Sequence, residues 1–256
     1  MSDALVTVDG PVLTVTFDRP HRHNALTFEM YDALHDACGR ADSDEQVRAL
    51  VVRGSGGRAF ASGTDISAFG GFQDGSDGVA YEERITRVVN RLEEVTVPTL
   101  AAVQGFCLGG GLVLAAACDV RIATGSARFG APIARTLGNC LSANSVSLLS
   151  SRLGSGRVLD LLLRARLLTA EEGLGAGFLA QVCDEDGLDQ AVEHELSTLL
   201  SHAPLTMWAT KVVVARQRRA GLVDADDVVA RAFGSEDFRS AVAGFGSRDT
   251  PSWQGR

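Results

Sequence analysis

Short β-branched strands that are each followed by a glycine-containing turn and a helical pattern constrain the fold of this chain most. The segments VRALVVRG (47–54) and TLAAVQG (99–105) both have this form. Strands that alternate with helical segments are typical of parallel sheets joined by crossover helices. The sequence therefore predicts an α/β fold built on parallel strands.

The first third of the chain carries clear local signals. Residues 4–20 alternate polar and apolar side chains around Asp9-Gly10, a dipeptide that favours a tight hairpin turn. Thr27 is expected to cap a helix that runs to about residue 39, because its hydroxyl can accept a hydrogen bond from the first turn. Residues 70–78 are rich in glycine and aspartate and are expected to form a loop.

Strand signals fade after about residue 142, and helical patterns continue to the end of the chain. The expected helices span 143–153, 156–163, 188–200, 204–218, 224–233 and 236–245. We therefore expect residues 1–195 to form an α/β core and residues 196–256 a helical C-terminal region.

Composition and charge narrow the class of protein. A chain of 256 residues is long enough to bury a substantial core. A net charge of −8 argues against binding to nucleic acid or to a membrane surface, although clustered arginines could still hold an anionic small ligand. The five cysteines show no CxxC spacing, and no signal-peptide pattern or membrane-length apolar run occurs. We expect a cytoplasmic protein with reduced thiols.

Several familiar catalytic motifs are missing from the sequence. The glycine-rich stretch 54–63 lacks the GK[ST] ending of a phosphate loop, and no dinucleotide fingerprint follows a strand. The chain has neither a GxSxG elbow nor HExxH, and its five histidines lie in no metal-ligand spacing. We expect no metal site.

Two strand–turn–helix junctions remain as candidate chemical elements, FASGTDI (60–66) and CLGGGLV (107–113). Glycine lets a ligand approach the backbone, and a helix N-terminus leaves N–H groups unpaired. Two such N–H groups that converge on one oxygen form an oxyanion hole. Taken singly, each junction is more simply interpreted as a tight turn.

Four segments occur in the order and spacing of the crotonase family, which includes the enoyl-CoA hydratases and isomerases. They are RPHRHNAL (19–26), AFASGTDI (59–66), GFCLGGGLVLAAACDVRIA (105–123) and ARFGAP (127–132), and residues 233–256 also resemble the family's ending. The resemblance implies a crotonase-like spiral of ββα units with a helical C-terminal trimerisation region. It also implies a homotrimer or homohexamer that acts in acyl-CoA or fatty acid metabolism, with coenzyme A as part of the substrate and no tightly bound cofactor.

The resemblance also assigns site residues. The family's oxyanion hole falls on the backbone N–H groups of Thr64 and Gly110, which would bind a thioester carbonyl and stabilise the enolate formed from it. The implied coenzyme A contacts are Arg22, Ser62, Asp65, Ile66 and Arg248. Asp65 could instead cap the following helix, and Arg248 could simply be solvated. The expected walls of the substrate pocket are Leu108, Val113, Pro132 and Ile133.

The sequence departs from the family at the residues that handle water in the hydratases. Those enzymes hold one glutamate three residues after the oxyanion glycine and another just after the FG-x-P segment. This chain has Val113 and Ile133 there, and no acidic residue occurs between Asp119 and Asp160. Apolar side chains transfer no protons, so we expect ordinary two-glutamate hydration to be weak or absent. The isomerases, which commonly use the second glutamate, lose their base as well.

Replacement chemistry could come from two places. The segment after Pro132 is polar for this part of the family and offers Arg135, Asn139, Cys140, Ser142 and Asn144. Cys140 is more simply a buried inert thiol, and Asn139 and Ser142 could only cap the helix near residue 143. The triplet Tyr81, Glu82 and Glu83 could also enter the pocket from above.

The sequence thus predicts an acyl-CoA enzyme that stabilises a thioester enolate, a lyase or isomerase in the broad sense. The alternative is a non-catalytic acyl-CoA-binding protein or a structural subunit of a mixed trimer, which the loss of both glutamates favours. His21 and His23 are expected on the coenzyme A side as surface residues.

Overall fold

The structure is a computed structural model that describes residues 3–246 and 252–256. Its larger sheet has six strands, and neighbouring strands run parallel except for the first two. In spatial order these are β1 (Ala4–Asp9), β2 (Val12–Phe17), β3 (Ala49–Gly54), β5 (Thr99–Val103), β7 (Val120–Thr124) and β10 (Gln181–Cys183). The predicted parallel α/β architecture is confirmed.

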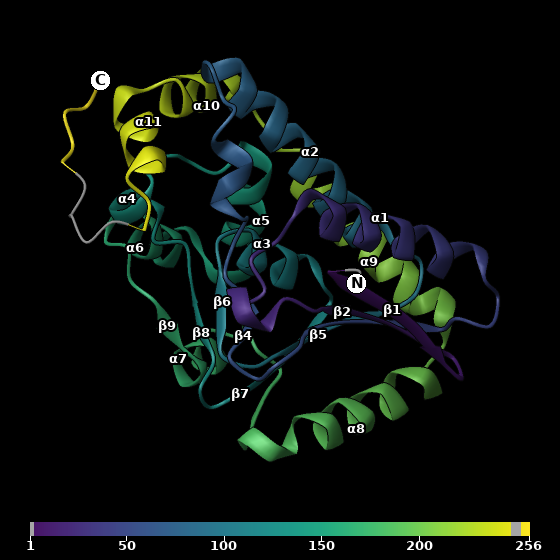
Figure 1. Ribbon diagram of the computed structural model, residues 1–256. Coiled ribbons are helices and arrows are strands. Elements are labelled where there is room, and N and C mark those ends of the chain that lie inside the picture. Colours follow the sequence, from purple (N-terminus) through teal and green to yellow (C-terminus); the bar gives the residue numbers. More distant parts are fainter. Residues whose placement is uncertain (1–2, 247–251) are drawn as a thin grey trace.

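A second sheet of four short strands lies beside the first. Its strands are β4 (Ala59–Ala61), β6 (Phe106–Leu108), β8 (Arg128–Gly130) and β9 (Leu168–Thr169). Along the chain, β3, β5 and β7 are each followed by one strand of this second sheet and then by helix. The repeated unit is therefore ββα, and successive units wind around the core as a spiral (Figure 1).

Helices cover both faces of the larger sheet (Figure 1). On one face, Leu50 and Val52 of β3 belong to the main core with the buried sides of α1 (Phe28–Ser43) and α2 (Gly75–Glu94). On the other face, Ala49 and Val51 pack with α8 (Leu188–Ser201). Successive residues of a strand point to opposite faces, so one short β-branched strand serves both cores.

The remaining helices are α3 (Gly110–Ala117), α4 (Ile133–Thr136), α5 (Ala143–Leu153), α6 (Ser155–Leu163), α7 (Ala170–Gly175), α9 (Pro204–Arg219), α10 (Asp226–Phe233) and α11 (Glu236–Ala243). Five of them, α5, α6, α9, α10 and α11, lie close to the predicted spans, whereas the sequence patterns do not predict the short helices α4 and α7. The helical C-terminal region is present as expected, although the short strands β9 and β10 were not foreseen. The division between residues 195 and 196 stays a prediction, and α8 runs through it.

The local signals near the N-terminus give two confirmations and one correction. β1 and β2 form the hairpin around Asp9-Gly10, and the Thr27 hydroxyl caps α1 by accepting the Met30 N–H at 3.3 Å. Residues 70–78 are not all loop, because α2 begins at Gly75. Asp74 and three residues later Asp77 form a reciprocal capping box there, which starts a helix despite the flanking glycines.

α2 is tied to the C-terminal helices at both ends. Near its N-terminus, Tyr81 packs against Phe233 of α10, with 5.8 Å between ring centroids. Near its C-terminus, the buried Glu93 forms ion pairs with Arg218 and Arg219 of α9.

No helix in the described part of the chain has both the length and the apolar character that a membrane crossing requires.

Candidate functional site

The two glycine junctions meet in space. β4 and β6 are parallel neighbours, so their carboxyl ends lie at the same edge of the small sheet. Gly63 and Gly109 follow these strands and have φ angles of 104° and 52°, a region that glycine adopts without a Cβ penalty. A Cβ atom on Gly109 would lie 3.5 Å from the Gly63 Cα, so the two turns are in contact.

The backbone N–H groups at these turns differ in whether they are hydrogen-bonded within the described part of the chain. The Gly109 N–H donates to the Gly130 carbonyl at 2.9 Å, and the Asp65 N–H donates to the Leu26 carbonyl at 2.9 Å. Among the described residues, no hydrogen bond uses the N–H of Thr64 or of Gly110, the first residue of α3. Both residues line one cavity of about 220 Å³.

Two tyrosines hold this pair of turns in place. The Tyr31 hydroxyl, from α1, lies 2.9 Å from Thr64 Oγ1, and the Tyr81 hydroxyl, from α2, lies 2.6 Å from the same atom. Burial raises the pKa of both phenols, so they remain neutral hydrogen-bonding groups. A Cβ atom on Gly110 would collide with the Tyr31 hydroxyl, so only glycine fits there without rearrangement.

The wall of the inner cavity is largely apolar. Of the predicted wall residues, Leu108, Pro132 and Ile133 line it, whereas Val113 is buried in the main core and is not among the lining residues. The cavity is completed by other apolar side chains, including Phe69, Leu137, Leu141 and Phe245.

Glu82 is an acidic side chain in this apolar cavity. It lies on the buried side of α2, is only 5% exposed and lines the cavity. Its Oε2 atom accepts the Ser142 N–H at 2.8 Å. Burial raises the pKa of Glu82 to about 7, and the hydrogen bonds with Ser142 only partly oppose this. The sequence placed Glu82 only within a triplet of alternatives, and its neighbour Glu83 is exposed.

Of the candidate polar residues in the segment after Pro132, only Asn139 lines the cavity, together with Thr136 from the same segment. Among the described residues, the buried Oδ1 atom of Asn139 has no hydrogen-bond partner. Ser142 caps α5, as the alternative interpretation held. Burial raises the pKa of the Cys140 thiol to about 12, so this thiol is protonated and unreactive at neutral pH. Arg135 is exposed and does not line the cavity.

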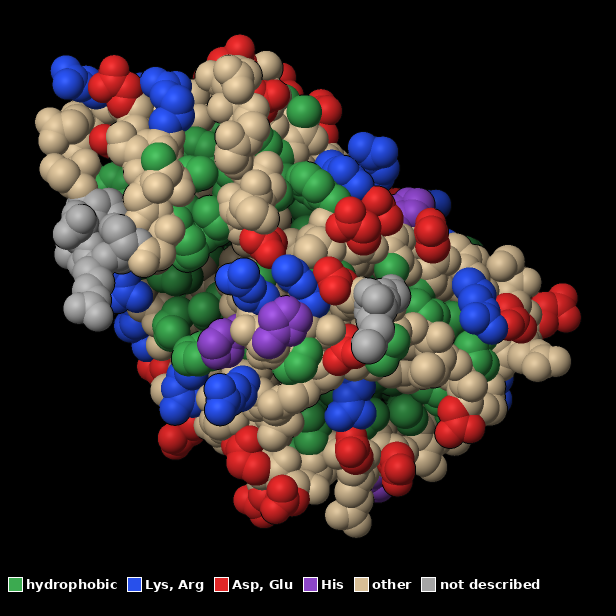
Figure 2. Space-filling model, in the orientation of Figure 1, with side chains coloured by type: hydrophobic (Ala, Val, Ile, Leu, Met, Phe, Trp, Pro, Cys, Tyr) green, Lys and Arg blue, Asp and Glu red, His purple; other side chains and the backbone are tan. Residues whose placement is uncertain are grey.

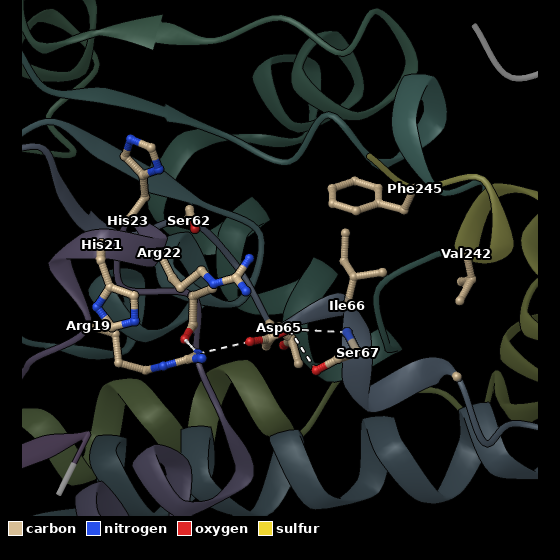
Figure 3. A pocket seen from close by; sticks show the side chains of 13 residues that line it. Arg19, His21, Arg22, His23, Ser62, Asp65, Ile66, Ser67, Val242 and Phe245 are labelled. Carbon is tan, nitrogen blue, oxygen red and sulfur yellow. Dashed lines mark hydrogen bonds and ion pairs between the residues drawn. The ribbon is translucent and has the colours of Figure 1, made fainter. Parts of the chain in front are cut away.

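A larger groove of about 740 Å³ opens beside the inner cavity (Figure 3). The two share Ser62, Thr64, Ile66 and Phe245, so they adjoin at the Thr64 turn. The groove is also lined by the basic or titratable side chains of Arg19, His21, Arg22 and His23. Figure 2 shows arginine and histidine side chains gathered around a hollow on this face.

The charged residues of the groove differ in how they are paired. Asp65 accepts hydrogen bonds from the Ser67 N–H at 3.1 Å and from Arg19 Nη1 at 2.9 Å. Burial alone would raise the pKa of Asp65, but these bonds outweigh it and lower the pKa. The cap interpretation of Asp65 is therefore confirmed. Arg22 forms no ion pair within the described residues, and Arg248 lies outside them.

The ββα spiral is the architecture of the crotonase class. The chain belongs to the enoyl-CoA hydratase/isomerase family, whose family model matches residues 7–256. Within the described residues, no group of three or more His, Cys, Asp or Glu side chains is arranged to hold a metal ion.

Similarity to individual proteins extends over the whole chain. A short-chain enoyl-CoA hydratase of Clostridium acetobutylicum is 29% identical over 249 residues, covering 96% of this chain and 95% of the relative. A 2,3-dehydroadipyl-CoA hydratase of Escherichia coli K12 is 27% identical and covers both chains fully. The crystal structure of an enoyl-CoA hydratase from Mycobacterium avium subsp. paratuberculosis has a TM-score of 0.84 at 27% identity and covers 99% of each chain.

Proposed function

We propose that this protein is an acyl-CoA-processing enzyme that binds a thioester carbonyl at the N–H groups of Thr64 and Gly110. The observation that carries this proposal is that neither N–H group has a hydrogen-bond partner among the described residues, and that both belong to residues lining one cavity. Two fixed N–H donors stabilise the negative charge that develops when a thioester becomes an enolate, and losing one such donor typically costs ~10²–10³ in rate. Preorganisation by the two tyrosines supports the same role.

The groove beside the cavity is the proposed site for the coenzyme A part of the substrate, with no other cofactor. Arg22 has no acidic partner among the described residues, so its guanidinium is available to phosphate oxygens. Ser62 and Ile66 line both spaces and would contact the chain that links the nucleotide to the thioester. The side chain of Asp65 is already occupied as a cap, which leaves its backbone for substrate. The role of Arg248 stays a sequence prediction.

Ordinary hydration is expected to be weak or absent in this protein. The positions that correspond to the two hydratase glutamates are Val113 and Ile133, and Ile133 faces the inner cavity as an apolar wall. Activating water and protonating the adjacent carbon is a task suited to two positioned acid–base groups. We therefore propose another enolate chemistry, such as isomerisation, decarboxylation, C–C cleavage or thioester hydrolysis.

The proposed assembly is a homotrimer or homohexamer formed through the helical C-terminal region. α9 has no buried residue in the isolated chain, and its exposed apolar side chains include Leu205, Trp208, Val213 and Val214. Exposed apolar surface of this kind is typical of an association site. The mass of the purified protein in solution, measured by light scattering, tests this proposal, and a monomer would contradict it.

Two measurements on the wild-type protein test the proposed function. Calorimetric titration with butyryl-CoA measures binding, and hydrogen exchange at the α-carbon of butyryl-CoA in deuterated buffer measures enolate formation. Binding with exchange is the expected result. Binding without exchange would favour the non-catalytic binder or the structural subunit of a mixed trimer, and absence of binding would overturn the proposal.

A further inference from the structure

We propose that Glu82 is the acid–base residue of this site and that its carboxyl group exchanges a proton with the substrate carbon next to the thioester carbonyl. The inference rests on the proposed function, because it needs a thioester held at Thr64 and Gly110. It places the acid on α2, away from both positions that are apolar here, Val113 and Ile133.

Contacts on either side of Glu82 hold its carboxyl group in the wall of the cavity that Thr64 and Gly110 also line. Its neighbour Tyr81 hydrogen-bonds Thr64 Oγ1 at 2.6 Å, which fixes this turn of α2 against the junction. Glu82 lines the same cavity as Thr64 and Gly110. The Ser142 N–H donates to the Oε2 atom of Glu82 at 2.8 Å. The carboxyl group is thus anchored in the wall of the cavity, where it can contact a substrate.

A comparison within α2 separates Glu82 from an ordinary structural acid. Glu93 lies on the same helix and is similarly buried, at 6% exposure against 5%. Glu93 is neutralised by Arg218 and Arg219, whereas no basic side chain pairs with Glu82 in the described part of the chain. An uncompensated acid in an apolar cavity is costly for stability, and such costs are typical of functional sites.

The groups that face Glu82 leave its carboxyl free to titrate near neutral pH. These are the neutral phenols of Tyr31 from α1 and Tyr81 from α2, and the Cys140 thiol from the segment before α5. The anchoring Ser142 N–H lies at the start of α5. Because burial raises the pKa of Glu82 to about 7, both protonation states are accessible at working pH. A general base is most effective under that condition.

The proposed step balances without any further reactant. The ionised carboxylate of Glu82 takes a proton from the α-carbon, so the C–H bond breaks and an O–H bond forms. The electron pair of that C–H bond moves into the enolate, whose oxygen carries the negative charge at the two N–H groups. Glu82 then returns a proton to carbon, which restores the carboxylate and the neutral thioester.

A single carboxyl group of this kind favours a particular class of reaction. Removal and return of a proton need only one group, whereas addition of water is best served by two. The other polar groups of the cavity, among them Asn139 and Thr136, can form hydrogen bonds but cannot accept a carbon-bound proton at neutral pH. The geometry therefore favours proton shifts within the acyl group over hydration.

The test compares Glu82→Gln with Glu83→Gln on the full chain, with butyryl-CoA as the probe. The two variants make the same chemical change on adjacent residues, but Glu83 is exposed. We expect Glu82→Gln to lower α-hydrogen exchange on the order of 10²-fold or more while the Kd for butyryl-CoA stays within about threefold. Glu83→Gln should match the wild type in both. Glu82→Asp, which keeps a carboxyl group but withdraws it, should recover part of the exchange.

A pH profile excludes a merely structural role. Wild-type exchange should rise as the pH passes through about 7, where Glu82 ionises, and this rise should be missing in Glu82→Gln. Exchange by Glu82→Gln at the wild-type rate would overturn the assignment of Glu82 and leave the proposed function standing. A wild-type protein that binds butyryl-CoA without exchange would overturn both the enzymatic proposal and the role of Glu82. Failure to bind would overturn the proposed function itself.

Discussion

Thr64 Oγ1 lies 2.6 Å from the Tyr81 hydroxyl, and this contact joins α2 directly to the turn that carries the Thr64 N–H group. Glu82 follows Tyr81 in the chain. The Tyr81–Thr64 contact therefore fixes the position of the proposed base relative to the proposed oxyanion donor. A shift of α2 would therefore move both together, which preserves their relative geometry.

The first prediction concerns this contact. Tyr81→Phe removes one of the two hydrogen bonds to Thr64 Oγ1, and we expect kcat to fall by about tenfold with a smaller change in KM. The free energy of unfolding should fall by about 1 kcal/mol, as is usual for one buried hydrogen bond. Tyr31→Phe removes the other bond. The free energy of unfolding of the double variant should fall by more than the sum of the two single effects, because the hydroxyl of Thr64 then loses both tyrosine partners. Strict additivity in denaturant titrations would contradict this coupling.

The second prediction concerns stability and pH. The pKa of Glu82 is raised from 4.5 to about 7, so between these values the folded chain binds a proton that the unfolded chain has released. The contribution of Glu82 to the free energy of unfolding should therefore fall as the pH rises from 4.5 to about 7, by roughly 3 kcal/mol at most.

Glu82→Gln removes this dependence, since the amide oxygen can still accept the Ser142 N–H. Above pH 7 the variant should be more stable than the wild type, and below pH 4.5 the two should be similar. Glu83→Gln serves as the control and should follow the wild-type curve. The free energy of unfolding of all three proteins would be measured by urea titration at several pH values. The same pH dependence in all three would show that the pKa of Glu82 is not shifted.

The third prediction concerns the groove. Arg22→Ala should raise the Kd for butyryl-CoA about fivefold, since an exposed charge contact contributes up to about 1 kcal/mol. The difference should shrink at high salt, because exposed charges are screened. Arg40→Ala removes the same charge from the exposed side of α1 and should leave binding unchanged. Equal effects of the two variants would indicate an influence of net charge rather than a phosphate contact.

The fourth prediction concerns hydration. With crotonyl-CoA as substrate, we expect kcat/KM at least ~10²-fold below that of the Clostridium acetobutylicum hydratase assayed in parallel, because each missing acid–base group usually costs 10²–10⁴. Comparable turnover by the two proteins would mean that water is activated without acids at positions 113 and 133.

Much of the fold could be predicted from the sequence because its signals are local. The turn at Asp9-Gly10 and the cap at Thr27 depend on neighbours in the chain, and both formed as expected. The two-residue strand β9 forms only because Leu168 pairs with Phe129, a contact that no periodicity indicates. The start of α2 differs from the predicted loop because the Asp74 and Asp77 capping pair outweighs the loop preference of the flanking glycines.

In the candidate site, too, residues marked by local sequence signals could be predicted, whereas residues that depend on distant contacts could not. Thr64 and Gly110 could be located from glycine-rich turns and a family resemblance. Tyr31 could not, because a buried tyrosine inside a helix looks like any core residue until the fold brings it to Thr64. Glu82 stood among three alternatives, and only burial distinguishes it from Glu83, which follows it in the chain.

The hydroxyl of Tyr31 also restricts the order in which this site can change over generations. It occupies the space that any side chain at position 110 would need. A lineage that acquires alanine at position 110 while Tyr31 is intact meets a steric collision at its active site. Loss of the hydroxyl must come first, and that step already removes one support of Thr64. Gly110, the middle glycine of the triplet 109–111, is therefore protected by a residue 79 positions away, and its replacement is contingent on an earlier, costly substitution.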